Sequence, residues 1–362
     1  MLELRTYRDG GQSAADVARE VAAFLGAAAE SLELALYDIR LHDEAGAIVK
    51  EALVGAQERG VRVRLVYNAE HHGPIPVPPP PRTAPELIEA LPNETKAIPG
   101  EPDLMHHKYV IRDREAIWTG SLNWTDDSWS RQENAIVIAE SPQLAHAFWL
   151  NFEELWEHAD VERSGFVEPR PVDVGGIEVR PWFTPGHGED LAHRIAKRIG
   201  NAKRRVRIAS PVLSSGPILG TLAEVCSDGK VDVAGIVDDT QVDGVLHQWK
   251  LNGNASWKVP VLRRLLERGH FAGKPSTRWS PGTVHDFMHA KIAVADDVSF
   301  VGSFNLSHSG ELNAENVLEI NDAPIADRLA AFVDEIRALY PLVTLPPEEG
   351  IQRTGGRTTV KG

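Results

Sequence analysis

The sequence predicts an α/β protein built from two similar halves. Three observations favour this fold class. One pattern of polar residues occurs twice, half a chain apart. Predicted strands and helices follow in the same order in both halves. The 362 residues are 42% hydrophobic and 25% charged, which is typical of a globular protein. We expect an N-terminal lobe at 1–170, a C-terminal lobe at 171–345 and a disordered tail at 346–362.

The first half begins with alternating helices and strands. Apolar residues at helical spacing behind the potential cap Ser13 predict the first helix, and Gly60 marks the end of the second. The expected elements are a helix at 13–30, a strand at 31–40, a helix at 47–59 and a strand at 61–67. This order favours a parallel pair of strands covered by the helix between them.

A proline-rich segment then interrupts the pattern. Residues 73–82 contain six prolines, which remove backbone donors and fix φ, so neither a helix nor a central strand can form there. We interpret the segment as a stiff surface loop of polyproline character, with a ligand for an aromatic groove as the alternative. A short helix is expected at 85–91.

The remaining elements repeat between the halves. The first half continues with strands at 108–112 and 116–119, a turn at 120–123, a strand at 134–138 and a helix to Trp156 that Ser141 can cap. The second half has a helix at 193–199, a strand at 205–210, a helix at 218–226, a strand at 231–237 and a final helix from Ala323 to Tyr340. Residues 240–285 show no regular pattern, and we expect them to be irregular.

A set of polar side chains recurs around the two central strands. The first copy consists of His106, Lys108, Asp113, Ser121, Asn123 and Glu133, and the second of His289, Lys291, Asp296, Ser303, Asn305 and Glu315. One residue is missing between Asp296 and Gly302, which we expect to shorten a turn and to leave activity intact. Because residues two apart on a strand point to the same side, each histidine shares a face with its lysine.

Two such sets, brought together by pseudo-two-fold symmetry, could act on a phosphoryl group. One imidazole would act as the nucleophile and the other as the general acid, since both titrate near neutrality. The lysines, asparagines and serines would donate hydrogen bonds to the non-bridging phosphoryl oxygens. Glu133 and Glu315 could each bond the far ring nitrogen of a histidine, if the strand after the turn lies beside the motif strand.

A metal centre at His106 and His107 is the competing interpretation. Neighbouring residues on a strand point to opposite faces, the second copy has Ala290 in place of His107, and a nearby lysine would repel a cation. We therefore expect no metal and no other cofactor. The histidines interpreted as ordinary surface or core residues are His71, His72, His107, His285 and His308, of which the last two could touch a substrate.

The doubled pattern His-x-Lys-x₄-Asp with Gly-Ser-x-Asn resembles the phospholipase D superfamily over residues 10–345. The resemblance implies a duplicated fold of two α/β/α lobes with mixed sheets, and a site at the pseudo-two-fold axis that cleaves phosphodiesters through a covalent phosphohistidine without metal. It implies His106 as the nucleophile and His289 as the acid that protonates the leaving alcohol. The phosphoryl oxygens would be held by Lys108, Lys291, Asn123, Asn305, Ser121 and Ser303. We expect Asp113 and Asp296 to be structural.

Composition narrows the class of protein further. A net charge of −14 argues against nucleic acid or anionic lipid covering the whole surface, but leaves room for a local basic cleft. The single cysteine, Cys226, excludes an intrachain disulfide. The sequence has no apolar run long enough to span a membrane and no apolar signal core, so we expect a cytoplasmic protein if Met1 is the natural start. The internal duplication favours a monomer.

The nature of the phosphodiester stays open in the sequence. Our first hypothesis is a phospholipid, hydrolysed or transferred to another alcohol, because aromatic residues near the motifs could hold acyl chains. These residues are Trp124, Trp129, Trp249, Trp257, Phe271 and Trp279. Core packing or base stacking would use them equally well.

A nuclease or nucleotide phosphodiesterase is the alternative. It is motivated by the basic residues Arg194, Lys197, Arg198, Lys203, Arg204, Arg205 and Arg207, to which Arg263, Arg264 and Arg268 add. A solvated helix face is the more ordinary interpretation of such a cluster. A non-enzymatic binding module that retains the fold is a third hypothesis.

Overall fold

The computed structural model describes residues 1–69, 94–253, 257–278, 280 and 282–343. The predicted proline-rich loop at 73–82, the helix at 85–91 and the tail at 346–362 lie outside these residues. Within them, every helix is too short or too polar to span a bilayer.

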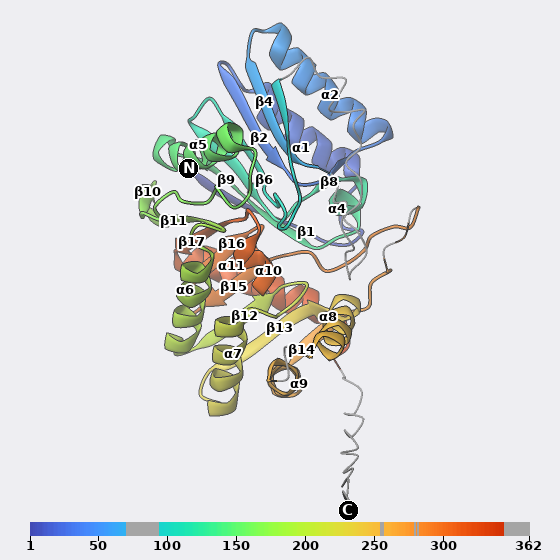
Figure 1. The fold of residues 1–362 in the computed structure, drawn as a ribbon, viewed down its shortest axis with the longest axis vertical. Helices are drawn as coiled ribbons and strands as arrows, with labels where there is room; N and C mark the ends of the chain where they lie inside the picture. Colours follow the sequence, from blue (N-terminus) through green and yellow to red (C-terminus); the bar gives the residue numbers. More distant parts are fainter. Residues whose placement is uncertain (70–93, 254–256, 279, 281, 344–362) are drawn as a thin grey trace, which may run out of the picture.

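The N-terminal lobe is built on a seven-stranded mixed sheet (Figure 1). Its strands, in spatial order, are β1 (Leu2–Tyr7), β9 (Asn134–Glu140), β7 (Ala116–Gly120), β6 (Lys108–Arg112), β2 (Ser31–Leu36), β4 (Arg62–Asn68) and β5 (Glu94–Ile98). The predicted parallel pairing is confirmed, since β2 and β4 run parallel, whereas β6 runs antiparallel to β2. A small separate pair joins β3 (Ile39–Arg40) to β8 (Trp124–Thr125).

Two helices cover the outer face of this sheet, α1 (Ala14–Gly26) and α2 (Asp43–Glu58). The first begins at a capping box, in which the Ser13 hydroxyl accepts from the Asp16 N–H and the Asp16 carboxylate accepts from the Ser13 N–H. The apolar face of α1 packs into a core with Val63, Leu65 and Trp118 from the sheet. Burial of these side chains fixes which face of the sheet points outward.

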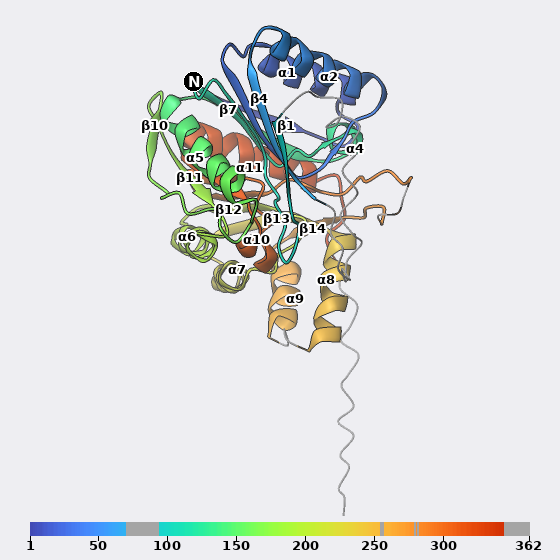
Figure 2. The same cartoon turned by 45° about the horizontal axis from the view of Figure 1, so that its top comes forward.

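The C-terminal lobe repeats the plan with eight strands. In spatial order they are β10 (Val172–Val174), β11 (Ile177–Phe183), β17 (Asn316–Asn321), β16 (Val298–Gly302), β15 (Ile292–Ala295), β12 (Arg205–Ala209), β13 (Asp232–Asp238) and β14 (Phe271–Lys274). Helices α6 (Gly188–Asn201), α7 (Gly216–Asp228) and α9 (Lys258–Arg268) pack on its outer face. Helix α8 (Asp239–Asn252) projects beside α9 from the body of the lobe (Figure 2).

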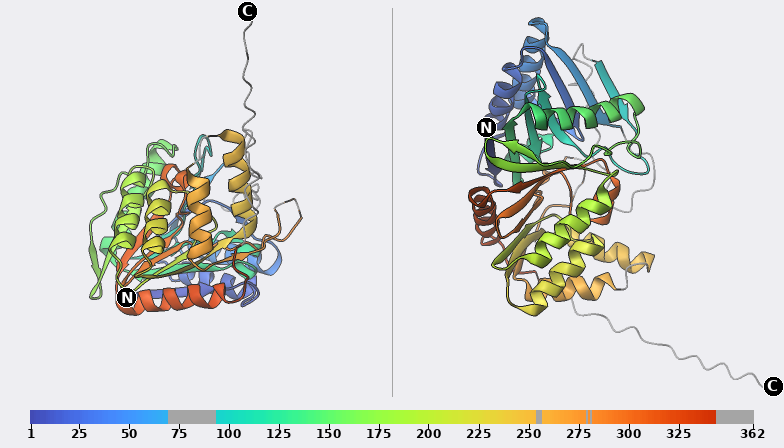
Figure 3. Two further views of the ribbon diagram at one scale, coloured as in Figure 1. Left: turned by 90° about the horizontal axis from the view of Figure 1, so that it is seen from below. Right: turned by 90° about the vertical axis from the view of Figure 1, so that its left-hand side faces the viewer.

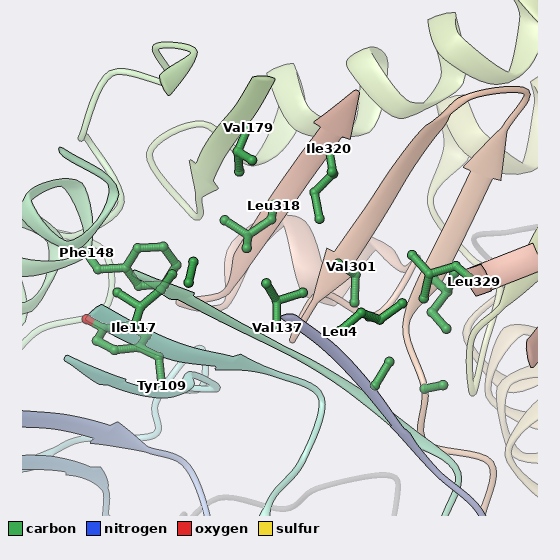
Figure 4. Packing of buried hydrophobic residues seen from close by; sticks show 14 of the residues in the cluster. Leu4, Tyr109, Ile117, Val137, Phe148, Val179, Val301, Leu318, Ile320 and Leu329 are labelled. Carbon is green, nitrogen blue, oxygen red and sulfur yellow. The ribbon is translucent and has the colours of Figure 1, made fainter. Parts of the chain in front are cut away.

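The inner faces of the two sheets meet in one shared core (Figure 3). Helices α5 (Pro142–His158) and α11 (Ala323–Arg337) lie in this central layer. The core joins side chains of the N-terminal lobe such as Phe148 and Val137 to Leu318 and Leu329 of the C-terminal lobe (Figure 4). Continuous apolar packing of this kind holds the two lobes in a fixed relation.

The prediction for residues 240–285 is wrong. The segment forms α8, α9 and β14. Asp238 caps α8 by accepting from the Gln241 N–H, and Gly253 ends the helix in the left-handed conformation. Val242, Val245, Leu246 and Trp249 follow helical spacing, so the periodicity of α8 and both of its end signals are present in the sequence.

The missing residue in the second copy shortens a hairpin, as predicted. Residues 113–115 connect β6 to β7, whereas 296 and 297 alone connect β15 to β16. Asp113 and Asp296 both adopt a positive φ, at 52° and 54°. The Asp113 carboxylate accepts from the backbone N–H groups of residues 29–31, and Asp296 accepts from those of residues 203–205. Each aspartate therefore ties its hairpin to the start of a neighbouring strand.

Candidate active site

The two motif histidines lie where the lobes cross. His106 precedes β6 and His289 precedes β15. Met105 pairs with Ala314 and Met288 pairs with Glu133, so each histidine segment runs beside the segment that leads into the last strand of the other lobe. The charges around the two rings act on one another, since His106 lowers the pKa of His289. One site at the lobe interface thus contains both imidazoles.

His106 is held by a carboxylate from the opposite lobe. Its Nδ1 lies 2.8 Å from both Oε1 and Oε2 of Glu315, and the Tyr37 ring packs edge-on at 4.6 Å. Burial raises the pKa of Glu315 to about 7, while Lys108 opposes that shift. Burial, Lys108 and Lys291 lower the pKa of His106. The lowered pKa favours the neutral ring, and the two carboxylate oxygens of Glu315 are placed to accept its Nδ1–H.

His289 is held by an amide instead. Its Nδ1 lies 3.0 Å from Oδ1 of Asn134, and the Phe287 ring packs edge-on at 4.8 Å. The Asn134 amide donates from Nδ2 to the Ser128 carbonyl, so its Oδ1 faces His289 as an acceptor. Burial, Lys291 and Lys108 lower the pKa of His289. The two histidines thus share a tautomer but differ in the charge of their partner.

The structure does not bring Glu133 to His289, contrary to our expectation. The Glu133 carboxylate accepts from Lys274 Nζ at 2.9 and 3.1 Å and from the Tyr340 hydroxyl at 2.8 Å. The cause is a difference in register. Gly302 faces Val317 fifteen residues later, but Gly120 faces Ile136, one residue further along the chain. The slip puts Asn134, not Glu133, in the place that Glu315 occupies.

The two motif lysines are buried beside the histidines. Lys108 Nζ donates to the His106 carbonyl at 2.6 Å, and Lys291 Nζ donates to the His289 carbonyl at 2.5 Å. Burial lowers the pKa of Lys108 to about 7 and lowers that of Lys291 as well, and Glu315 opposes both shifts. A bound anion would raise the pKa of both lysines and so stabilise their charged forms, which makes the pair suited to an anionic ligand.

The serines and the asparagines of the Gly-Ser-x-Asn turns have different roles, although we expected both to hold phosphoryl oxygens. Ser121 Oγ donates to Asn134 Oδ1 at 2.7 Å, and the Ser303 hydroxyl bonds to Glu315, so the serines orient the partners of the histidines. Asn123 Oδ1 and Asn305 Oδ1 are buried with no hydrogen-bond partner among the described residues. An unpaired Oδ1 can accept from a donor of the ligand, and the Nδ2 of the same amide can donate to a phosphoryl oxygen.

Only glycine fits at the start of each turn. A Cβ on Gly120 would lie 2.2 Å from the Ala135 carbonyl oxygen, and one on Gly302 would lie 2.0 Å from that of Asn316. Gly120 also has a φ of 155°. The missing side chain lets the last strand approach closely enough for Asn134 and Glu315 to reach the histidines.

His107 points away from the site. Its ring lies among the rings of Tyr109 and Phe183, and its Nδ1 is 3.3 Å from Asn316 Oδ1. Burial lowers the pKa of His107 to about 3. His106 and His107 face opposite sides of the strand and cannot chelate one ion together. The described residues contain no group of three side chains suited to a metal, and the absence of a cofactor stays a prediction.

Two supporting residues escaped the sequence interpretation. Asn68 Oδ1 accepts from the Met105 N–H at 2.9 Å, and Asp238 Oδ2 accepts from the Met288 N–H at 3.0 Å. Each fixes the residue before a motif histidine. A signal was present, because Asn68 and Asp238 are the first residues after the two strands that correspond between the halves, at 61–67 and 231–237.

The chain is similar to several known proteins. A family described as "Cardiolipin synthase, PLD-like domain" matches residues 21–156 and 195–337. Cardiolipin synthase A of Pectobacterium carotovorum is 25% identical over 315 residues, which cover 79% of this chain and 60% of that protein. The human mitochondrial cardiolipin hydrolase is 30% identical over 90 residues, which cover 23% of this chain and 36% of that protein. The chain therefore spans less than two thirds of either relative.

The fold also has a counterpart among solved structures. The phosphatidylserine synthase of Haemophilus influenzae Rd KW20 superposes with a TM-score of 0.64 over 94% of this chain and 87% of that chain. The two sequences are 14% identical, so the likeness concerns the fold. The predicted duplicated α/β fold with mixed sheets is confirmed by this comparison and by the two matched segments.

Proposed function

The chain belongs to the phospholipase D superfamily, in the family described as "Cardiolipin synthase, PLD-like domain", and we propose that it is a phosphodiesterase that acts on a phospholipid through a covalent phosphohistidine, without a metal ion. The observation that carries the proposal is the pair of buried imidazoles from opposite lobes, each with its Nδ1 bound to an acceptor. In both rings Nε2 remains as the nitrogen that can react.

In the first step, His106 Nε2 attacks the phosphorus atom and forms a P–N bond. The P–O bond to the leaving alcohol breaks, and His289 gives the Nε2 proton to the departing oxygen. The His106 ring becomes positively charged, and Glu315 at 2.8 Å neutralises that charge. The negative charge of the bound substrate offsets Lys108 and Lys291 and raises the pKa of His289, which makes the imidazolium available.

In the second step, His289 accepts a proton from water or from an acceptor alcohol. The oxygen attacks phosphorus, the P–N bond breaks, and its electron pair returns to His106 Nε2. Lys108, Lys291, Asn123 and Asn305 hold the non-bridging oxygens in both steps. Water as the acceptor gives hydrolysis, and an alcohol gives transfer of the phosphatidyl group.

The basic residues that motivated a nuclease give it little support. Glu319 pairs with Arg194 and Arg198, and the three arginines at the start of β12 pair with aspartates. Asp296 receives the backbone N–H of Arg205 at the end of β15 remote from His289. Charges that are neutralised and distant from the site contribute little to the binding of a polyanion.

A phospholipid is the preferred substrate because two relatives carry lipid-modifying names and an apolar, basic surface lies on α8 and α9. Leu251 is 72% and Trp257 49% exposed, and Lys250 on α8 and Arg264 on α9 are exposed as well. Such a surface suits a membrane interface. Three of the aromatic residues proposed to hold acyl chains, Trp124, Trp129 and Phe271, are buried in the cores of their lobes and do not support that role.

The test is a parallel assay in chelator of vesicles of cardiolipin, phosphatidylglycerol or phosphatidylcholine, and of single- and double-stranded DNA. The proposal expects release or exchange of a lipid head group, absent in His106→Ala, with DNA left intact. Cleavage of DNA without lipid turnover would favour the nuclease, and unchanged turnover by His106→Ala would remove the proposed mechanism. The monomeric state remains a prediction that analytical ultracentrifugation can test.

A further inference from the structure

The site is chemically asymmetric although its fold is duplicated. His106 faces a carboxylate, whereas His289 faces an amide in the equivalent place. The carboxylate that the sequence offers for His289, Glu133, is adjacent in the chain to Asn134 but lies in another cluster. Something must hold the segment so that the amide, and not the neighbouring carboxylate, reaches the histidine.

A buried ion cluster from both lobes holds this segment. Lys274 of β14 has its side chain 3% exposed and binds Glu133 at 2.9 Å and Asp9 at 3.1 Å. The Tyr340 hydroxyl adds a bond to Glu133, and Asp9 in turn binds Arg131 at 2.7 Å. Glu133 is itself 1% exposed. A carboxylate buried this deeply stays charged only where partners of this kind compensate it.

We propose that Lys274 is a positioning residue: by binding Glu133 it fixes the register that presents Asn134 to His289, and thereby gives the two histidines different roles. The proposal rests on the phosphohistidine mechanism above. Lys274 contacts no reacting atom in that mechanism. It acts through Glu133 and the backbone of the segment that carries Asn134.

The asymmetry matters because the two rings need opposite properties. A carboxylate stabilises the positive ring that forms when His106 Nε2 bonds to phosphorus. His289 must release its proton in one step and regain it in the next, and a neutral amide orients the ring without stabilising the imidazolium. A freed Glu133 carboxylate near His289 would make that proton harder to release.

Several charged groups set the pKa of His289, and the test must separate them. Lys291 follows on the same strand segment, Lys108 and His106 face it from the opposite lobe, and His285 lies on the preceding loop; all four lower the pKa. Asn134 is the neutral partner. None of the four is altered by a change at Lys274 or Glu133, so a shift in the titration of His289 reports on those two residues.

The experiment measures the pH profile of kcat/KM with a water-soluble short-chain phospholipid. Activity falls on the alkaline side as His289 loses the proton it must donate. Asn134→Asp places a carboxylate against His289, so this limb should move up by about one pH unit or more. Lys274→Met should move the limb in the same direction, and Glu133→Gln/Lys274→Met should return it toward the wild-type position. Lys258→Met, which removes a half-buried ammonium elsewhere in the lobe, should leave it unchanged.

The outcomes separate the proposals. If Lys274 has only a structural role, Lys274→Met lowers the melting temperature and the total activity. The alkaline limb of its pH profile then stays in place, or it moves but does not return in the double variant. Either result would overturn the inference. Lys274→Gln, which keeps a polar group but removes the charge, covers the case in which Lys274→Met fails to fold, and an unmoved alkaline limb in Lys274→Gln or in Asn134→Asp also overturns the inference. Active wild-type enzyme without a phosphorylated histidine in rapid-quench samples would defeat the proposed function itself.

Discussion

Replacing Glu315 by glutamine removes the negative charge that lies against His106 and leaves a hydrogen-bond acceptor in place. The amide oxygen can still accept from Nδ1–H, as Asn134 does for His289, so the tautomer of His106 is preserved. What is lost is the attraction between the carboxylate and the positive ring of the phosphohistidine. At a charge separation of about 4 Å and an effective dielectric constant of about 20, that attraction is about 4 kcal/mol.

We therefore expect kcat of Glu315→Gln to fall by about a thousandfold. The wild-type kcat/KM should also fall as pH drops through the raised pKa of Glu315, about 7, because the protonated group carries no charge; this acid limb should disappear in the variant. Rapid-quench measurement of the first turnover reports the step directly. Glu154→Gln, which alters a half-buried carboxylate bound to the Gly165 N–H, is the matched control. A loss below tenfold, or an acid limb that persists, would refute the role of Glu315.

Other expectations follow from the same structure. Gly302→Ala should lower the free energy of unfolding by about 3 kcal/mol or more in denaturant titrations, because its Cβ would lie 2.0 Å from a carbonyl oxygen. Asp113→Ala should cost about 2–4 kcal/mol for its lost bonds to backbone N–H groups, with kcat of the folded fraction unchanged; a large loss of kcat would show a catalytic role. Asn305→Ala should raise KM or lower kcat by about tenfold without lowering the melting temperature. Activity should survive dialysis against EDTA, and its loss would indicate a metal.

Much of the fold could be predicted because its signals are local. Ser13 and Ser141 cap helices where the sequence places them, and β6 has the predicted limits, Lys108 and Arg112. Helix α9 escaped although Leu262, Leu265 and Leu266 follow helical spacing before Gly269. β1 and β5 also went unpredicted, and each lies at an edge of its sheet. β5 alternates little, whereas β1 does alternate, as Leu-Glu-Leu-Arg-Thr-Tyr.

The partners of the histidines could be predicted only in part. Gly120 and Asn134 are separated by the same number of residues as Gly302 and Asn316, and the flanking Glu133 and Glu315 match as well. Two residues separate α4 (Asp126–Ser130) from Glu133, but one separates α10 (His308–Leu312) from Ala314. The one-residue difference in register arises where the chain leaves these short helices, and the pairing of the following strand accommodates it. Pairing between distant segments leaves no trace in residue spacing.

The covalent intermediate can be observed by mixing enzyme with phospholipid, quenching at alkaline pH within the first turnover, and mapping the adduct by mass spectrometry. The arrangement of Glu315 and Asn134 predicts a phosphatidyl group on Nε2 of His106. With a leaving group that departs without protonation, such as p-nitrophenolate, the adduct should accumulate in His289→Asn, because that variant lacks the base for the second step. An adduct on His289, or rapid turnover with no adduct on either histidine, would contradict the reaction proposed for this site.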